Sequence, residues 1–169
     1  MKPERGYEAL RRFRVSTPHS DYFLTCCTHD RQEGLTLPTL ATAVREEISQ
    51  MERAGYWTVR GAVIMPDHFH LLATLHDIMT LDRIMARLKS KTRPTLSSAG
   101  LEWQGNFYEH RLRDGEAAEP VLTYLFLNPY RAGLIPATNA RPLFWLGADA
   151  AAWFMPLLDD GRPFPEWLR

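Results

Sequence analysis

Two histidines separated by one residue, His68 and His70, are the first candidates for chemistry in this sequence. They lie in the run HFHLLATL, whose β-favouring residues predict a strand over residues 68–75. Residues two apart in a strand face the same side, so both imidazoles would point one way while Phe69 points into the core. Two neutral imidazoles at this spacing can bind one divalent cation. An isolated pair is more often a turn residue beside a packed histidine, and the pair alone leaves that alternative open.

A tyrosine and an asparagine four residues apart are the second candidate group. The spacing of apolar residues predicts a helix over residues 116–127, ended by Asn128 and Pro129. Residues four apart on a helix share a face, so Tyr124 and Asn128 could serve one small site. A phenol has a pKa of about 10 and is a weak nucleophile at neutral pH, but a cation that polarises a phosphate would compensate. Without the histidines, a half-buried tyrosine and a helix stop explain these residues better.

A basic segment follows the histidines. Residues 83–113 contain seven Lys or Arg residues and two acids, although the whole chain has a net charge of zero. A helix from residue 81 to about residue 94 is predicted by apolar residues at helical spacing, namely Leu81, Ile84, Met85 and Leu88. Its other side contains a basic stripe of Arg83, Arg87 and Lys91, with Lys89 and Arg93 beside it. Such a stripe suits a nucleic-acid backbone, and a merely soluble surface is the alternative.

The remaining patterns predict the scaffold for these residues. Strands are expected over residues 21–28, 57–65, 68–75 and 107–112, and a further helix over residues 38–55. Pro66 and Asp67 would join the two central strands as an antiparallel hairpin. The order β, α, β, β, α, β, α predicts an α+β fold: a ferredoxin-like antiparallel sheet with helices packed on it, plus an added C-terminal helix and an irregular tail.

Length and composition limit the organisation. The 169 residues, 45% of them apolar, predict a single domain over residues 1–169, with a core over about residues 10–135 and a tail over residues 136–169. Cys26 and Cys27 are adjacent, so they are expected to be reduced thiols. Neither an apolar signal-peptide segment near the start nor a run of about 20 apolar residues is present, which predicts a cytoplasmic protein with no membrane partner.

Five segments together resemble the REP-associated tyrosine transposases, which are relatives of insertion-sequence transposases with one catalytic tyrosine. They are YFLT from Tyr22, AVIMPDHFHLL from Ala62, LKS from Leu88, WQGNFYEH from Trp103 and YLFLNPYRAG from Tyr124. They occur in the same order and at comparable spacing over about residues 10–135. Two departures are the neutral net charge and the tail after about residue 136, for which no counterpart is found.

The resemblance implies an HUH endonuclease that cuts and rejoins single-stranded DNA at repetitive extragenic palindromes folded as hairpins, through a 5′-phosphotyrosine. His68 and His70 match the metal-binding pair, Tyr124 the nucleophile, and Asn128 the polar residue that completes the site for Mg²⁺ or Mn²⁺. Single-stranded or hairpin DNA, at the nucleoid, is the expected partner. We expect the DNA to contact the basic residues, with aromatic rings available for base stacking: Arg83, Arg87, Lys89, Lys91, Arg93, Trp103 and Phe107.

Two other functions remain open at this point. One is a protein that keeps the fold and binds hairpin DNA without cutting it. The other is a metal hydrolase in which a metal-bound water attacks, so that Tyr124 is dispensable. The chain could act as a monomer or a homodimer, and the sequence does not determine which bases are recognised or whether the tyrosine acts in cis or in trans.

Overall fold

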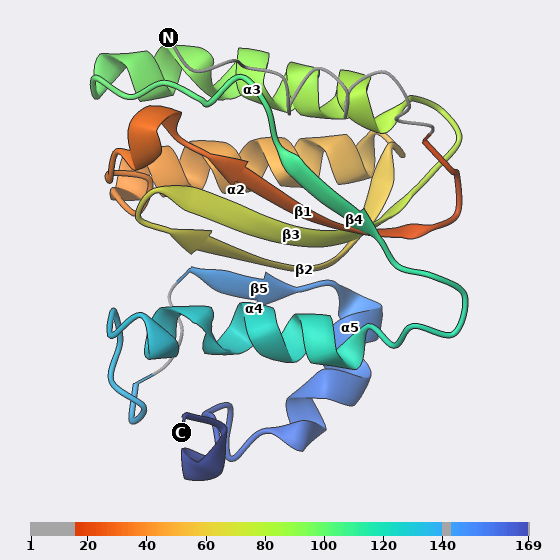
Figure 1. The fold of residues 1–169 in the computed structure, drawn as a ribbon, viewed down its shortest axis with the longest axis vertical. Helices are drawn as coiled ribbons and strands as arrows, with labels where there is room; N and C mark the ends of the chain where they lie inside the picture. The colour runs from red at the N-terminus through yellow and green to blue at the C-terminus, as the bar shows by residue number, and fades with distance from the viewer. Residues whose placement is uncertain (1–15, 140–142, 169) are drawn as a thin grey trace, which may run out of the picture.

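The computed structural model describes residues 16–139 and 143–168. Its strands and α-helices are, in chain order, β1 (Asp21–Cys27), α2 (Pro38–Arg53), β2 (Trp57–Met65), β3 (His68–Leu75), α3 (Leu81–Ser98), β4 (Tyr108–Arg111), α4 (Glu119–Arg131), β5 (Phe144–Leu146) and α5 (Ala148–Phe154). Short 3-10 helices are η1 (His29–Arg31), η2 (Met155–Leu157) and η3 (Pro165–Leu168). The elements form three layers, with α2 and α3 on one face of the sheet and α4 and α5 on the other (Figure 1).

One antiparallel sheet of five strands, in the order β4-β1-β3-β2-β5, organises the chain. Its first four strands, with α2 and α3 packed on one face, form the predicted ferredoxin-like α+β fold, which is confirmed. β2 and β3 form the predicted hairpin, in which Met65 pairs with His68 across the turn of Pro66 and Asp67. β1 pairs with β3 on its other side, so that Thr25 lies opposite His70.

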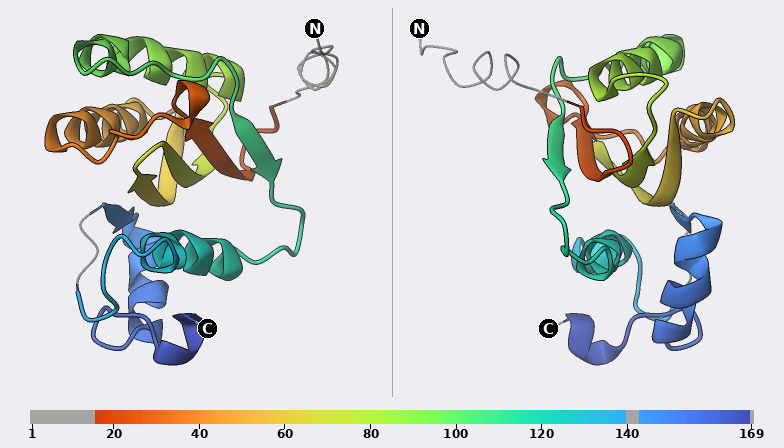
Figure 2. Two further views of the ribbon diagram at one scale, coloured as in Figure 1. Left: turned by 60° about the vertical axis from the view of Figure 1, so that its left-hand side comes forward. Right: turned by 90° about the vertical axis from the view of Figure 1, so that its right-hand side faces the viewer.

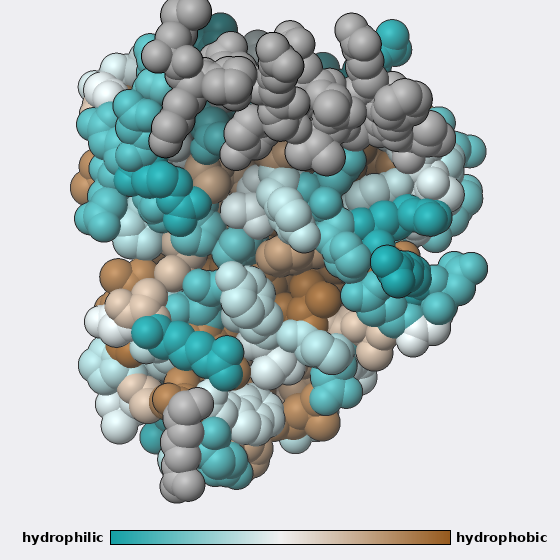
Figure 3. Space-filling view, viewed as in Figure 1, coloured by the Kyte–Doolittle hydropathy of each residue, from teal (hydrophilic) through white to brown (hydrophobic). Residues whose placement is uncertain are grey.

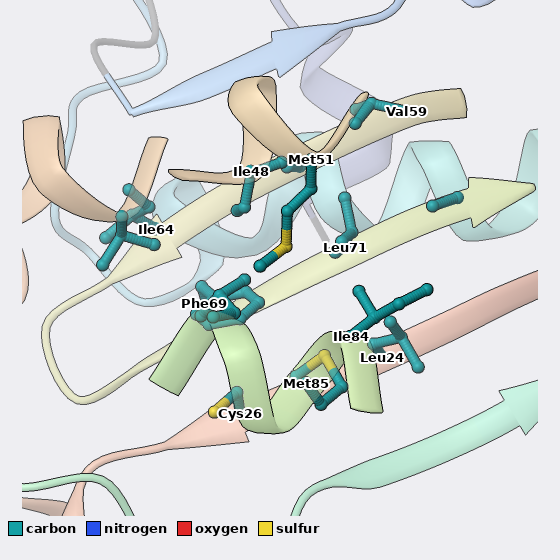
Figure 4. Packing of buried hydrophobic residues seen from close by; sticks show 14 of the residues in the cluster. Leu24, Cys26, Ile48, Met51, Val59, Ile64, Phe69, Leu71, Ile84 and Met85 are labelled. Atoms are coloured by element: carbon teal, nitrogen blue, oxygen red, sulfur yellow. The ribbon is translucent and has the colours of Figure 1, made fainter. Parts of the chain in front are cut away.

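The larger core lies between the sheet and the helices α2 and α3. Alternate residues of β1 and β3 point into it, among them Leu24, Phe69 and Leu71, which are fully buried. Ile48 of α2 and Ile84 of α3 pack onto these side chains from above (Figure 4). Each such side chain contributes about 1.5–3 kcal/mol through burial, so this face is fixed by many apolar contacts.

The second core is smaller and leaves part of its face uncovered. α4 and α5 lie against β2 and β3, where Val63, Leu72, Leu122 and Phe126 are fully buried. Gly61 allows this close approach, because a Cβ atom there would lie 2.6 Å from Leu122 Cδ2. β1 and β4 extend beyond α4, as the rotated views show (Figure 2). Their side chains on this face are only partly buried or are exposed.

Two helices continue past prolines at which the sequence predicted that they would end. α3 runs through Pro94 to Ser98, and α4 begins at Glu119 and runs through Pro129 to Arg131. A proline removes one helical hydrogen bond, but burial of residues beyond it favours continuing the helix. Leu96 is fully buried after Pro94, and Tyr130 is buried after Pro129. Asn128 therefore lies inside a helix and does not end one.

The segment 136–169 is more ordered than the sequence predicted. It contains β5, which pairs with β2 at the edge of the sheet, and α5, which packs in the second core through Ala150 and Phe154. The expectation of an irregular tail was therefore wrong for residues 144–154. Residues 10–15, which were expected to begin the core, lie outside the described residues. In the part of the chain that is described, no helix has the length and apolar character needed to cross a membrane.

Candidate active site

The two histidines of β3 face each other at the rim of the second core. His68 Nε2 lies 3.0 Å from His70 Nε2. Both side chains are largely buried, since His70 is 5% exposed and the His68 side chain 12%. The strand alternation predicted from the sequence is confirmed, because Phe69 between them points to the opposite face and packs in the larger core.

Each imidazole is held by a partner on its other nitrogen. His68 Nδ1 donates to Asp67 Oδ1 over 2.6 Å, and His70 Nδ1 lies 2.8 Å from Thr25 Oγ1 on β1. Asp67 Oδ2 is in turn 2.6 Å from the Nε atom of Arg31 in η1. With both Nδ1 atoms protonated, both Nε2 lone pairs point toward one position. This is the arrangement by which proteins orient metal-binding histidines.

The environment keeps both imidazoles neutral. Burial, with smaller effects from the neighbouring His68 and Arg31, lowers the pKa of His70 to about 3. Burial also lowers the pKa of His68, although its hydrogen bond to Asp67 opposes the shift. The Asp67 pKa is itself lowered, since the hydrogen bond from His68 and the charge of Arg31 outweigh the effect of burial. Neutral imidazoles are the form that binds a cation.

The loop after β1 fixes the hairpin that presents His68. The backbone N–H of Thr28 donates to the Asp67 carbonyl oxygen over 2.9 Å, and the N–H groups of Gly34 and Leu35 both donate to the Pro66 carbonyl oxygen over 2.8 Å. The two turn residues are thus held from outside the hairpin. Arg31 reaches Asp67 from the same loop, with its backbone in the left-handed region at φ 58°.

Tyr124 extends from α4 toward the histidines. Its hydroxyl oxygen lies 3.5 Å from His70 Nε2, and its ring is 45% exposed. Phe23 of β1 supports this arrangement, since its ring stacks on His70 with centroids 5.2 Å apart and meets the Tyr124 ring edge-on at 5.9 Å. The Tyr124 hydroxyl therefore lies on the same face of the sheet as both imidazoles.

Two other tyrosines, Tyr130 of α4 and Tyr108 of β4, belong to elements near the candidate site. Tyr130 is 7% exposed, and its hydroxyl donates to the Asn139 carbonyl oxygen over 3.0 Å, so it belongs to the second core. Tyr108 of β4 pairs with Thr25 and lies on the same face as the histidines, but its nearest ring contact in the site is Phe23, at 6.3 Å. Tyr124 is the tyrosine whose hydroxyl lies within 3.5 Å of a histidine nitrogen.

Asn128 follows Tyr124 by one turn of α4. The helix begins over Gly61, where Leu122 packs, and Pro129 lies near Pro66 at the hairpin. α4 therefore runs from Gly61 toward the hairpin, so that its end with Asn128 lies near the end of β3 with His68. The Asn128 Nδ2 atom is buried and has no hydrogen-bond partner among the described residues. A buried amide N–H usually has an acceptor, so an acceptor group is expected at Nδ2, whereas a cation would bind the Oδ1 atom of the same side chain.

The donor set fits a divalent cation. Two nitrogens bound at about 2.1 Å and at a right angle lie about 3.0 Å apart, as in octahedral coordination. The Nε2 atoms of His68 and His70 show this separation. Within residues 16–139 and 143–168, no third His, Cys, Asp or Glu joins them as a metal-binding group. The amide of Asn128 is therefore the protein group that could complete the set.

The predicted DNA-binding stripe lies on the other side of the sheet. Arg83, Arg87, Lys91 and Arg93 are exposed on α3, which packs on the face that Phe69 enters. The histidines and Tyr124 are on the opposite face, beside α4. The stripe and the candidate site therefore lie on opposite faces, and the predicted contact of DNA with the stripe stays a prediction. The opposite placement of stripe and histidines could have been inferred from the sequence, because Phe69 points away from the histidines and toward the helices.

Two of the residues expected to contact DNA have partners within the protein. Lys89 Nζ donates to the Gln104 and Asn106 carbonyl oxygens over 2.7 and 2.9 Å. Trp103 donates from Nε1 to Thr92 Oγ1 over 2.8 Å, and its ring packs edge-on against Phe69. These groups fasten the segment before β4 to α3 and the larger core. The predicted binding of phosphate by Lys89 and of bases by Trp103 stays a prediction.

Sequence analysis missed the residues that support the histidines. Thr25, Phe23 and Arg31 lie in or just after β1, more than 30 positions from the histidines, and approach them only once β1 pairs with β3. The run from Tyr22 contributed to the resemblance, but no role could be assigned to its residues. Asp67 was recognised only as a turn residue, although its position next to His68 was a usable signal.

Comparisons with known proteins agree with this architecture. The family model of the IS200-like transposases matches residues 16–112. The REP-associated tyrosine transposase of Escherichia coli (strain K12) is 24% identical over 138 residues, which cover 80% of this chain and 82% of that protein. A relative from Haemophilus influenzae (strain ATCC 51907 / DSM 11121 / KW20 / Rd) is 28% identical over 158 residues, with coverages of 84% and 88%.

A solved structure shows the same fold. It is that of a REP-associated tyrosine transposase bound to a REP hairpin, and it superposes with a TM-score of 0.65 at 20% sequence identity, covering 85% of this chain and 82% of that chain. The resemblance found in the sequence is thereby confirmed. The family model matches more than half of the residues of this chain, so the chain belongs to the IS200-like transposase family.

Proposed function

We propose that this chain is a metal-dependent endonuclease and strand transferase that cuts and rejoins single-stranded DNA at REP-type palindromic hairpins. Membership of a transposase family supports the reaction class. The similarity to a transposase bound to a REP hairpin supports the hairpin substrate. The proposal rests mainly on one observation, which is the Tyr124 hydroxyl 3.5 Å from one of two imidazoles that face a common position.

In the proposed cleavage step, Tyr124 Oη forms a bond to the scissile phosphorus and the bond from phosphorus to the 3′ oxygen breaks. The phenolic proton is lost to water and the departing 3′ oxygen takes one up. The products are a 5′-phosphotyrosine and a free 3′-OH, with no oxidation or reduction. Attack by a 3′-OH on the phosphotyrosine reverses the step, so the covalent intermediate keeps the bond energy for rejoining.

The chain's own groups determine where this attack occurs. His68 Nε2, His70 Nε2 and the Asn128 amide would hold Mg²⁺ or Mn²⁺, which when bound supplies Lewis-acid stabilisation of the phosphate charge. Asp67 and Thr25 orient the two imidazoles from behind. Phe23 fixes the Tyr124 ring against His70. The helix α4 places nucleophile and amide on one rigid element, which favours a fixed reaction geometry. A protein with this activity would work at the nucleoid in the cytoplasm.

A covalent-adduct assay tests the proposal. The purified chain is incubated with a hairpin oligonucleotide that has single-stranded flanks, with Mn²⁺ or with EDTA, and separated on a denaturing gel. We expect an adduct with Mn²⁺ and none with EDTA, and no adduct from Tyr124→Phe under either condition. Tyr108→Phe is the matched control, since it removes a hydroxyl on the same face, and it should form the adduct.

The same assay separates the alternative functions. Binding of the hairpin with no adduct under any condition would contradict the proposal and favour a non-catalytic DNA-binding protein. Cleavage that persists in Tyr124→Phe would also contradict it, because a metal-bound water would then be the nucleophile.

A further inference from the structure

Exposed aromatic side chains are concentrated beside the candidate site. Among the described residues, the aromatic side chains that remain exposed are Tyr108 at 57%, Tyr124 at 45% and Trp153 at 36%. Two of these three lie on the sheet face that contains the histidines. Exposing a large ring to water loses the free energy that its burial would give, so such grouping indicates a ligand.

The rings near the histidines form a continuous row. Tyr108 of β4 contacts Phe23 of β1 edge-on with centroids 6.3 Å apart, and Phe23 contacts both His70 and Tyr124. Tyr108 is paired with Thr25, the residue whose hydroxyl orients His70. Because β4 is the edge strand of the sheet, Tyr108 lies at the open end of this row.

The surface around the row is open. α4 and α5 lie against β2 and β3 and leave the β1 and β4 part of this face uncovered. The space-filling view shows hydrophobic side chains at the bottom of a recess between the sheet and α4 (Figure 3). Arg31 lies at the hairpin side of the same face with a side chain 54% exposed, and it supplies a positive charge near the row.

We propose that Tyr108 is a base-stacking residue that holds an unpaired nucleobase of the DNA strand next to the phosphate attacked by Tyr124. The proposal deepens the proposed function, on which it rests, by naming the surface where the single strand lies. A flat ring exposed at the end of a row of aromatic side chains presents one face to a base, and bases of any sequence can stack on it. The strand then approaches Tyr124 along β4 and β1, not along α3.

The other expected stacking residues do not offer such a surface. Trp103 packs against Phe69 in the larger core. The Phe107 ring has Lys89 Nζ 5.9 Å from its centre and is partly buried on the same core. Both lie on the opposite side of the sheet from Tyr124. Tyr108 follows Phe107 directly, and the strand alternation brings it to the face of the candidate site.

The test measures DNA binding without cleavage, so it does not depend on the outcome of the adduct assay. All variants are made in a Tyr124→Phe background, which keeps the Tyr124 ring. The probes are a fluorescent hairpin oligonucleotide with single-stranded flanks and the same hairpin without flanks. Tyr108→Ala and Tyr108→Leu remove the aromatic face, Tyr108→Phe keeps it, and Trp153→Ala is the matched control, since Trp153 is exposed on α5.

We expect Tyr108→Ala and Tyr108→Leu to raise the Kd for the flanked hairpin by about 5- to 100-fold, the range found when a stacking ring is removed. Tyr108→Phe and Trp153→Ala should bind within about twofold of the parent, and the hairpin without flanks should bind all variants alike. 2-Aminopurine in the flank should be quenched by the parent and not by Tyr108→Ala. Unchanged affinity of Tyr108→Ala and Tyr108→Leu, or an equal loss in Tyr108→Phe, would overturn the proposal.

Discussion

The two faces of the sheet differ in how completely they are covered. On the face of α2 and α3, apolar residues of β1, β2 and β3 form the larger core, and polar groups such as Lys89 fasten loops to the helices. On the face of α4 and α5, the helices cover β2 and β3, and the uncovered part begins at His70 and Tyr124. The candidate site lies at the boundary between a rigid core and an open surface, where groups are held firmly but a substrate could still reach them.

Basic residues occur on both faces of the sheet, and the sequence alone does not distinguish Arg31 from the stripe of α3. Arg31 is cationic, as are the exposed stripe residues of α3, namely Arg83, Arg87, Lys91 and Arg93, but of these five only Arg31 lies on the face of the histidines. It contacts Asp67, which orients His68. The stripe residues of α3 lie on the face of the sheet opposite the histidines. Any effect they have on the reaction would therefore have to act through DNA bound on that face.

The largest effect is expected from the histidines. His68→Ala or His70→Ala removes one of the two nitrogens that face the common position, so the adduct with hairpin DNA should become undetectable. Binding of the hairpin should persist, because the DNA surface is intact. Gel analysis of adduct and fluorescence anisotropy of binding measure the two separately. Adduct formation at the wild-type rate by either variant would show that the metal-site assignment is wrong.

A smaller effect is expected from Arg31→Met, which keeps the length of the side chain and removes its charge. Loss of the contact with Asp67 leaves His68 less firmly oriented, so the affinity for Mn²⁺ should fall about 10- to 100-fold, as for other residues that support metal ligands. Isothermal titration calorimetry without DNA measures this directly.

Arg53→Met is the matched control for Arg31→Met. Arg53 forms an ion pair with Glu46 at the same distance of 2.6 Å and is similarly exposed, but it lies on α2. It should leave Mn²⁺ affinity unchanged. Equal Mn²⁺ affinity of the wild type and Arg31→Met would show that the ion pair does not position His68.

The basic stripe of α3 should affect DNA binding and not the chemical step. Replacing Arg87 and Lys91 by glutamine should weaken binding across sequences and reduce its salt dependence, by about 0.7 in slope for each lost contact with a single strand. At saturating DNA the rate of adduct formation should stay the same, because the stripe lies on the other face. Titrations at several salt concentrations distinguish the outcomes. A slower rate at saturation would contradict the separation of the two faces.

The smallest effect concerns stability and pH. Burial lowers the pKa of His70 to about 3 in the folded chain, against an ordinary value of about 6.5. Neutral His70 contributes fully to the free energy of unfolding above about pH 6.5. This contribution is lost as the pH falls toward 3, because the unfolded chain then binds a proton that the folded chain does not. From about pH 7 to about pH 5 the wild type should lose roughly 1–2 kcal/mol more than His70→Gln. Urea unfolding at both pH values tests this, and equal losses would contradict it.

Much of the fold could be predicted because its patterns are local. The strands at residues 57–65 and 68–75 were predicted with the bounds that the structure shows, since alternation and the turn of Pro66 and Asp67 lie within the segments themselves. The ends of α3 and α4 were not predicted, because burial of Leu96 and Tyr130 comes from distant parts of the chain. β5 is only three residues long and becomes a strand by pairing with β2.

The candidate site could be predicted only in part, for a similar reason. His68 with His70, and Tyr124 with Asn128, are pairs within one element, so helical and strand spacing was enough to group them. Placing the two pairs together requires knowing on which face of the sheet α4 lies. α4 is an addition to the ferredoxin-like order, and the order of elements does not assign it to either face. Phe23, Thr25 and Arg31 join the site only through pairing of β1 with β3, which no local spacing reveals.

The most direct test of the account is to identify the residue bonded to DNA. The adduct formed with a hairpin oligonucleotide and Mn²⁺ is digested with nuclease and protease, and the peptide with a remaining nucleotide is sequenced by mass spectrometry. We predict the modification on Tyr124, linked through a 5′ phosphate. A nucleotide on Tyr108, on Tyr130 or on any other residue would contradict the assignment of the hydroxyl beside His70 as the nucleophile.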